Sequence, residues 1–182
     1  EDNFRRRLSG AVFLSRVAGG FPERYWPTGP ERFVDDWPSV NLTVRREAFE
    51  AAGGFDSAYW PGEDTKFCLE LVRKTGGKIL YNPRLVVYHH RREGFLLHLR
   101  QVGRYGLHRG YFARTLPETS RRWYYFLPSC LFLALILSPA AMLFVPLRPL
   151  VGAGAVLYAA ALLKAMTDIL DKEKNVRLAA CA

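Results

Sequence analysis

The chain has 182 residues and a formal net charge of +9 at pH 7, a basic balance that points to an anionic partner such as nucleic acid, a membrane surface or substrate phosphates. Its three scattered cysteines, Cys68, Cys130 and Cys181, form no metal-ligand or disulfide spacing, which argues against a disulfide-stapled secreted domain and fits a reducing compartment. The last third of the chain differs so strongly in composition from the rest that a single soluble domain is a poor description.

Residues 1–33 are rich in Gly, Pro, Arg and aromatic side chains and show little periodicity. This composition predicts an irregular segment lying on the surface. The chain opens without a methionine and shows no signal peptide, so we expect a fragment of a longer protein.

Residues 34–93 alternate short strand-like and helix-like stretches. The pattern predicts strands at 39–44, 78–81 and 85–89, and helices at 45–52 and 64–75 that end at Gly53 and Gly76. This is α/β material, yet a stretch this short cannot by itself bury the core of a doubly wound domain. We therefore expect that an N-terminal half belongs to the same fold.

Two adjacent carboxylates, Glu63 and Asp64, fall at the first turn of the second predicted helix. An Asp at a helix start is most often an N-cap that accepts backbone N–H bonds. The same position also suits a general base at the mouth of a site, and spacing alone leaves both interpretations open.

Residues 94–122 interleave apolar side chains with arginines and lead directly into an uncharged run. This pattern is typical of a basic amphipathic helix at the membrane interface, and it favours a membrane surface over nucleic acid. All four histidines lie at 89–108. Histidines at a strand end are usually exposed surface residues, with metal binding as the alternative.

Residues 123–170 contain two apolar runs, of which 124–145 carries no charge and as a helix would be about 33 Å long, enough to cross a hydrocarbon core of about 30 Å. The second run reaches about residue 170 if Lys164 and Asp168 pair across one turn. The short connector at 146–149 predicts a helical hairpin with both outer ends on one side of the membrane. The alternative is a pair of helices buried in the core of a soluble protein. Basic residues flank both outer ends, so the segment before residue 123 and the tail at 171–182 are predicted to be cytoplasmic, in a multi-pass protein of the inner (cell) membrane.

Five segments resemble, in order and spacing, the C-terminal half of a family 2 glycosyltransferase of the GT-A fold. They are VDDWPSVNLTVRREAFEAAGGFD at 34–56, GEDT at 62–65, KILYNP at 78–83, VYHH at 87–90 and QVGRY at 101–105. The implied fold class is α/β: a partial GT-A-like domain, with 34–93 as its acceptor-side half, followed by a transmembrane helical hairpin.

The resemblance implies inverting transfer of a sugar from a nucleotide-sugar to an acceptor hydroxyl, on a lipid-linked or growing surface glycan. It places the base on Asp64, with Glu63 orienting it. Its late histidine falls on His89, with His90 as the alternative, and its Gln-x-x-Arg-Trp-like motif falls on donor-binding residues Gln101, Arg104 and Tyr105. We assign the acceptor-side loop to Asp35, Asp36, Asn41 and Trp60.

A divalent metal, Mg²⁺ or Mn²⁺, is implied as a cofactor, with His89 as a possible ligand. The family's Asp-x-Asp metal motif does not occur in these 182 residues, so we expect it upstream and expect this piece to be inactive alone. Two rival hypotheses are a non-catalytic membrane-anchored adaptor that binds anionic lipid through its Arg-rich segment, and a pore or transporter fragment that uses Lys164 and Asp168. Neither explains the ordered motifs between residues 34 and 105.

Overall fold

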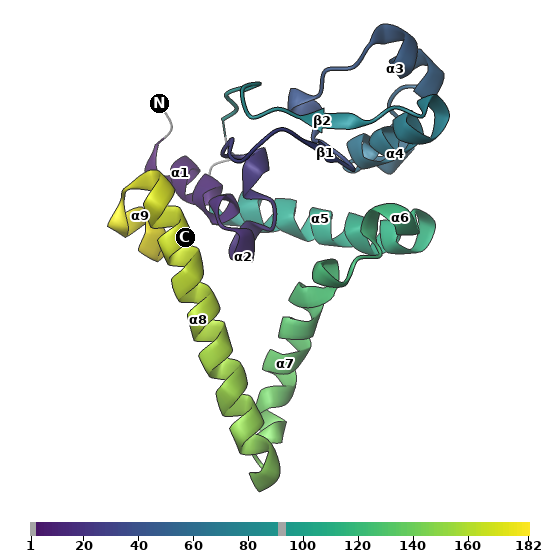
Figure 1. Ribbon diagram of the computed structural model, residues 1–182. Coiled ribbons are helices and arrows are strands. Elements are labelled where there is room, and N and C mark those ends of the chain that lie inside the picture. Colours follow the sequence, from purple (N-terminus) through teal and green to yellow (C-terminus); the bar gives the residue numbers. More distant parts are fainter. Residues whose placement is uncertain (1–2, 91–93) are drawn as a thin grey trace.

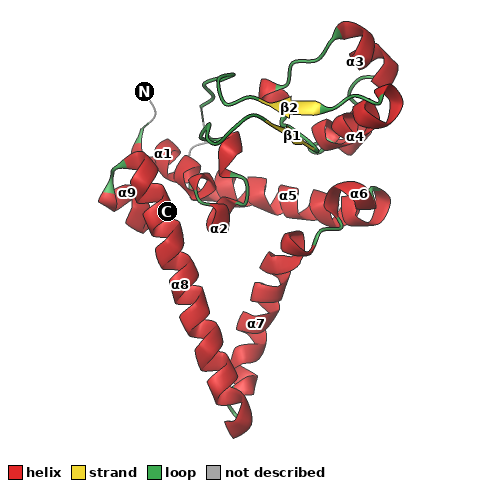
Figure 2. Cartoon of the chain, viewed as in Figure 1, coloured by secondary structure: helices red, strands yellow, loops and turns green. Residues whose placement is uncertain are grey.

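The computed structural model describes residues 3–90 and 94–182, which are mostly helical with one small sheet (Figure 2). The two strands are β1 (Arg32–Val34) and β2 (Ile79–Tyr81). The helices are α1 (Phe4–Ala11), α2 (Arg16–Gly19), α3 (Arg46–Ala52), α4 (Glu63–Thr75), α5 (Phe95–Thr115), α6 (Pro117–Ser120), α7 (Leu127–Ala141), α8 (Arg148–Glu173) and α9 (Val176–Cys181).

Helices α7 and α8 form a V, and α5 lies across its open end (Figure 1). The sheet and helices α3 and α4 lie on the other side of α5 from the V. Helices α1 and α9 sit beside the end of α8, so the N-terminal segment and the C-terminus meet at the open end of the hairpin. The site motifs are thereby gathered on one side of α5 and the apolar helices on the other.

The two predicted apolar helices are confirmed as helices. The stretches Trp123–Ala141 and Val145–Glu173 are long and apolar enough to cross a membrane, each with a mean hydropathy of 1.6 and with none of that window buried. They meet near the connector, where a 3₁₀ turn at Val145–Leu147 reverses the chain. Their exposure contradicts the alternative of a buried helical pair.

The expectation of an irregular N-terminal segment at 1–33 is wrong. Asn3 and Ser15 cap α1 and α2 with side-chain bonds, and Ala11 and Leu14 are buried against Ile169 of α8. Residues 171–182 are also more than a tail, because α9 buries Leu178 and Ala179 in the same cluster. The apolar partners are more than 150 residues apart in sequence, so no local periodicity could reveal this core.

The predicted α/β class is confirmed only in part, since the described residues contain one two-stranded sheet. Its strands are antiparallel, with Val34 opposite Ile79 and Arg32 opposite Tyr81. The strand predicted at 78–81 is confirmed at 79–81, whereas those at 39–44 and 85–89 are wrong and β1 was missed. The two failed stretches touch through the Asn41 amide, which donates to the Leu85 carbonyl over 3.0 Å, and form no ladder.

Helices α3 and α4 confirm the predictions for 45–52 and 64–75. Each ends at a glycine in the left-handed region, Gly53 at φ 91° and Gly76 at φ 64°, where other residues are strained. The two helices pack through Phe49 and Phe67, whose ring centroids lie 5.2 Å apart. This pairing fixes α4, and with it the carboxylates at its start.

Candidate functional site

The predicted placement of Glu63 and Asp64 in the first turn of a helix is confirmed, because α4 begins at Glu63. The N-cap position belongs to Gly62, so Asp64 is not the cap. Its carboxylate nevertheless accepts two backbone N–H bonds, one to Oδ1 from Thr65 over 2.8 Å and one to Oδ2 from Ser39 over 3.3 Å. These bonds hold the carboxylate in one orientation between α4 and the loop after Trp37.

Burial raises the pKa of Asp64 above its ordinary value, and the negative charges of Asp36 and Glu63 act in the same direction. The N–H bonds from Thr65 and Ser39 oppose the rise without cancelling it. A carboxylate whose ionised form is disfavoured in this way is a stronger proton acceptor than an exposed one. The arrangement is chemically suited to general-base catalysis.

Asp36 lies next to this carboxylate and is the centre of an ion-pair network. It pairs with Arg24 through Oδ1 and with Arg109 of α5 through Oδ2, at 3.3 Å, and the Thr65 hydroxyl also donates to Oδ2 over 3.0 Å. Burial alone would raise the pKa of Asp36, but the two arginines and the Thr65 hydroxyl outweigh it and hold this pKa below its ordinary value. Asp36 therefore stays ionised beside Asp64.

One buried carboxylate oxygen of Glu63, Oε2, has no hydrogen-bond partner among the described residues. A buried acceptor without a partner is costly, and such atoms mark places where a ligand or solvent can bind. Glu63 thus offers a free acceptor directly beside Asp64.

Helix α5 brings the donor-motif residues next to the start of α4. The guanidinium of Arg104 lies over the ring of Trp60, 5.3 Å from its centroid, and Gln101 Nε2 donates to the Tyr105 hydroxyl over 2.6 Å. The buried ring of Phe112 packs directly on Gly62. Arg104 is exposed, so its charge is available to an anionic ligand beside Trp60.

The remaining predicted residues lie apart from this cluster. His89 and His90 are exposed in the loop between β2 and α5, and Asp35 pairs with Arg122 near the start of α7. Within residues 3–90 and 94–182, no three His, Cys, Asp or Glu side chains come together in a way that could hold a metal ion. The described residues therefore do not fit a divalent metal, and the role of His89 as a ligand stays a prediction.

Sequence reasoning missed two residues that contact the acidic cluster. Arg24 comes from the segment expected to be irregular, and no periodic signal marks it. Thr65 directly follows Asp64 in the GEDT motif, and this position was the one sequence signal that could have indicated its contact with the acidic cluster. Arg109 was counted only as one of many arginines of the basic stretch.

An open pocket of about 500 Å³ adjoins the Asp36 network, between β1, α4 and the start of α7. Its walls carry charged side chains, including Asp35, Asp36 and Arg122, and the aromatic rings of Phe21, Phe33, Trp37, Tyr124 and Tyr125. The pocket offers flat apolar faces and hydrogen-bonding groups side by side.

Fold and site together define an enzyme-like unit with a desolvated carboxylate, joined to a hairpin of apolar helices. The model of the family described as Glycosyl transferase family group 2 matches residues 29–168, about three quarters of the chain, and the chain therefore belongs to this family. The predicted resemblance is confirmed, and the family indicates a glycosyltransferase that uses a nucleotide-sugar donor and an acceptor. No curated protein and no solved structure matches the chain.

Proposed function

We propose that this protein transfers a sugar with inversion from a nucleotide-sugar to an acceptor hydroxyl, and that Asp64 is the general base. The observation that carries the proposal is a carboxylate that two backbone N–H bonds fix at the first turn of α4, beside the unpartnered Oε2 of Glu63, and burial that raises its pKa supports the proposal. Asp64 takes the proton of the acceptor hydroxyl as its oxygen attacks the anomeric carbon. The bond from that carbon to the phosphate oxygen breaks, and its electron pair leaves with the nucleoside diphosphate.

The leaving diphosphate carries growing negative charge, so cationic groups should face it. Arg104 suits this role, because the Trp60 ring beneath its guanidinium limits where the charge can lie. Gln101 and Tyr105 would complete the donor contact from the same helix. A divalent ion, Mg²⁺ or Mn²⁺, stays part of the proposal as a companion of the donor, with its principal ligands outside the described residues and His89 as a further ligand, and no step here depends on it.

For the acceptor, we propose the pocket beside Asp36. Asp64 does not itself line this pocket, so the reacting hydroxyl would have to extend past Asp36 to the start of α4. Its aromatic walls suit the faces of a sugar ring, and its paired charges suit sugar hydroxyls. Asp35 and Asn41 would lie on the acceptor side, whereas Trp60, also expected there, contacts Arg104 and is proposed here for the donor side instead. The carboxylate of Asp36 is occupied by Arg24, Arg109 and Thr65 and would act by holding the loop in place.

We propose that α7 and α8 cross the inner membrane and that the site faces the cytoplasm. Leaving the apolar faces of both helices in water would be costly, because burying apolar surface is worth about 25 cal/mol per Å². Helix α5 carries exposed apolar residues such as Phe95, Leu96 and Leu107 in addition to its arginines, as expected at the headgroup level. A site in this position favours a lipid-linked acceptor, in surface polysaccharide or glycolipid synthesis.

The test is sugar transfer by the full product of the gene, reconstituted in lipid nanodiscs and offered a panel of radiolabelled nucleotide-sugars with a membrane lipid extract. The proposal predicts label in a lipid or glycan product from at least one donor, with inverted configuration at the anomeric carbon. Absence of transfer and of donor binding, with intact binding to anionic vesicles, would favour the non-catalytic adaptor instead.

A further inference from the structure

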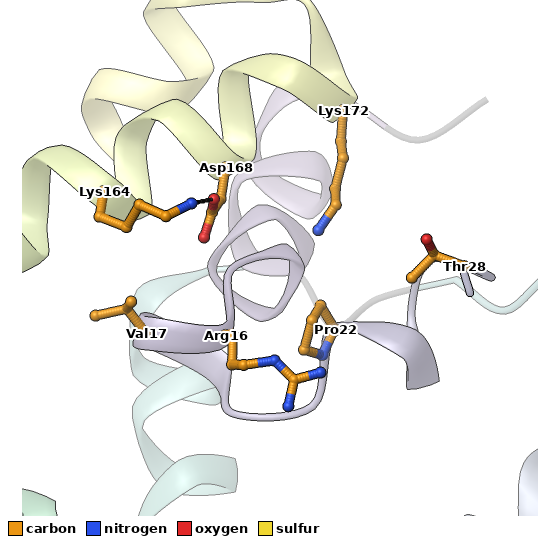
Figure 3. Close-up of a pocket in the computed structure, with 7 residues that line it drawn as sticks. All are labelled: Arg16, Val17, Pro22, Thr28, Lys164, Asp168 and Lys172. Carbon is orange, nitrogen blue, oxygen red and sulfur yellow. Dashed lines mark hydrogen bonds and ion pairs between the residues drawn. The ribbon is translucent and has the colours of Figure 1, made fainter. Parts of the chain in front are cut away.

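A second pocket, of about 480 Å³, lies where α8 meets α2, away from the carboxylates of α4. Its lining consists of Arg16, Val17, Pro22, Thr28, Lys164, Asp168 and Lys172. Small-molecule pockets typically measure about 300–1,000 Å³, so its size suits a small ligand group. In Figure 3, Asp168 and Lys172 point from α8 toward the segment that carries Arg16 and Pro22.

The charges in this pocket do not cancel. Asp168 is the one carboxylate in the lining, and it is neutralised by Lys164 and held by the Ser15 hydroxyl, which donates over 2.9 Å. Lys172 donates one N–H to the Leu14 carbonyl, which leaves two further donors on its ammonium. Arg16 shares Glu23 with Arg32, and its own side chain is 69% exposed. The pocket therefore keeps an excess of cationic donors.

The pocket also lies at a defined depth along α8. Lys164 follows Arg148, the first residue of α8, by 16 positions and Lys172 follows it by 24, which places them about 24 Å and 36 Å along the helix axis. A hydrocarbon core is about 30 Å thick. If Arg148 lies at one interface, the pocket lies at the level of the opposite headgroups, with exposed Leu162 and Leu163 on the membrane side of it.

We infer that this pocket binds the phosphate group of an anionic phospholipid, with Arg16 and Lys172 as the principal contacts. Val17 and Pro22 would contact the glycerol and upper acyl chain. The inference rests on the membrane location proposed above for α8, and it concerns residues other than the arginines of α5. A soluble phosphate could satisfy the same cations, but the depth of the pocket and its apolar neighbours favour a lipid.

The test uses the full protein in phosphatidylcholine nanodiscs with a trace of spin-labelled phosphatidylglycerol or phosphatidylcholine. Electron spin resonance gives the fraction of each lipid that is motionally restricted by the protein. We expect phosphatidylglycerol to be preferred severalfold, and Arg16→Gln to remove most of that preference, because one basic side chain is worth about fivefold near an anionic surface. Lys172→Gln should act in the same direction.

The matched control is Lys174→Gln, which removes the same charge at the same end of α8 from an exposed residue outside the pocket. It should change the preference less than twofold. The inference would be overturned if the control lost as much of the lipid preference as Arg16→Gln, or if the wild-type protein showed no preference. It would also be overturned if millimolar inorganic phosphate displaced the labelled phosphatidylglycerol at constant ionic strength. If neither lipid is restricted, the membrane location itself fails, and that result is distinguishable from the others.

Discussion

Gly62 lies so close to the ring of Phe112 that a Cβ atom at Gly62 would come within 2.6 Å of the ring. The residue that caps α4 and precedes the candidate base is thus also the contact point of α5. The base lies on α4 and the donor-motif residues lie on α5, so their relative positions depend on the close contact between Gly62 and Phe112. The site therefore requires this spacing between the two helices.

The first prediction tests that contact. Gly62→Ala should lower the stability by about 1–3 kcal/mol, the usual cost of overpacking, because the Phe112 ring must move. Gly106→Ala is the matched control, since a methyl group there meets nothing within 4 Å and removes a flexible residue from the interior of α5. Thermal melts should show a lower Tm for the first variant and an equal or higher Tm for the second. A normal Tm for Gly62→Ala would show that the two helices are not in close contact.

The second prediction concerns the ionised Asp36. Its pKa in the folded state is below the ordinary value, so its ion pairs stabilise the fold above that value, and this contribution is lost as the pH falls through the lower, folded pKa. Asp36→Asn leaves Arg24 and Arg109 without their carboxylate and should cost about 3–5 kcal/mol at pH 7. The difference from wild type should shrink in melts as the pH falls below the ordinary pKa of a carboxyl group. A constant difference at all pH values would contradict the network.

The third prediction concerns the donor. Arg104→Ala should weaken the binding of nucleoside diphosphates about tenfold or more, because a charge-assisted bond contributes about 1.5–3 kcal/mol. Arg100→Ala, on the same helix, is the control for general loss of charge. His89→Ala should also weaken binding in the presence of Mg²⁺ or Mn²⁺. If calorimetry with UDP, GDP and ADP shows unchanged affinity for both Arg104→Ala and His89→Ala, the basic stretch serves only the membrane surface.

The fourth prediction concerns topology. Basic residues flank both outer ends of the hairpin, and α9 packs on α1, so a reporter fused through a flexible linker after Ala182 should register as cytoplasmic. The linker is needed because Leu178 and Ala179 are buried. A periplasmic signal would mean that one helix crosses the membrane and that α8 does not return.

Helices α3 and α4 were predictable because their signals are local, whereas α1, α2 and α9 depend on distant contacts with α8 and were not predicted. The apolar spacing in α4 and the glycine stops after α3 and α4 can be read within a dozen residues, and the structure reproduces them. The strands were less predictable, because β-propensity describes one strand and does not show whether a partner strand is present. Residues 85–89 include the β-branched Val86 and Val87, yet both side chains are exposed and have no partner strand.

The candidate site divides in the same way. Glu63 and Asp64 could be placed from the helix start that they share, and Arg104 from its motif on α5. Arg24 could not be predicted, because its role is an ion pair with Asp36, and no sequence pattern near Arg24 indicates that tertiary contact. The raised pKa of Asp64 likewise depends on burial by tertiary packing and, to a smaller extent, on the charge of Asp36 from another loop.

The most direct test of the account is the transfer rate of Asp64→Asn in the full enzyme, measured beside its melting temperature. Asn can keep one of the two backbone N–H bonds, so the variant should fold with a loss of about 1 kcal/mol and still bind the donor. A general base contributes about 10²- to 10⁴-fold, so transfer should be at least about a hundredfold slower. The acid limb of the wild-type rate profile, expected above the ordinary pKa of a carboxyl group because burial raises the pKa of Asp64, should disappear from whatever activity remains. Near-normal transfer by a normally folded variant would contradict the assignment of Asp64 and leave the start of α4 with a structural role alone.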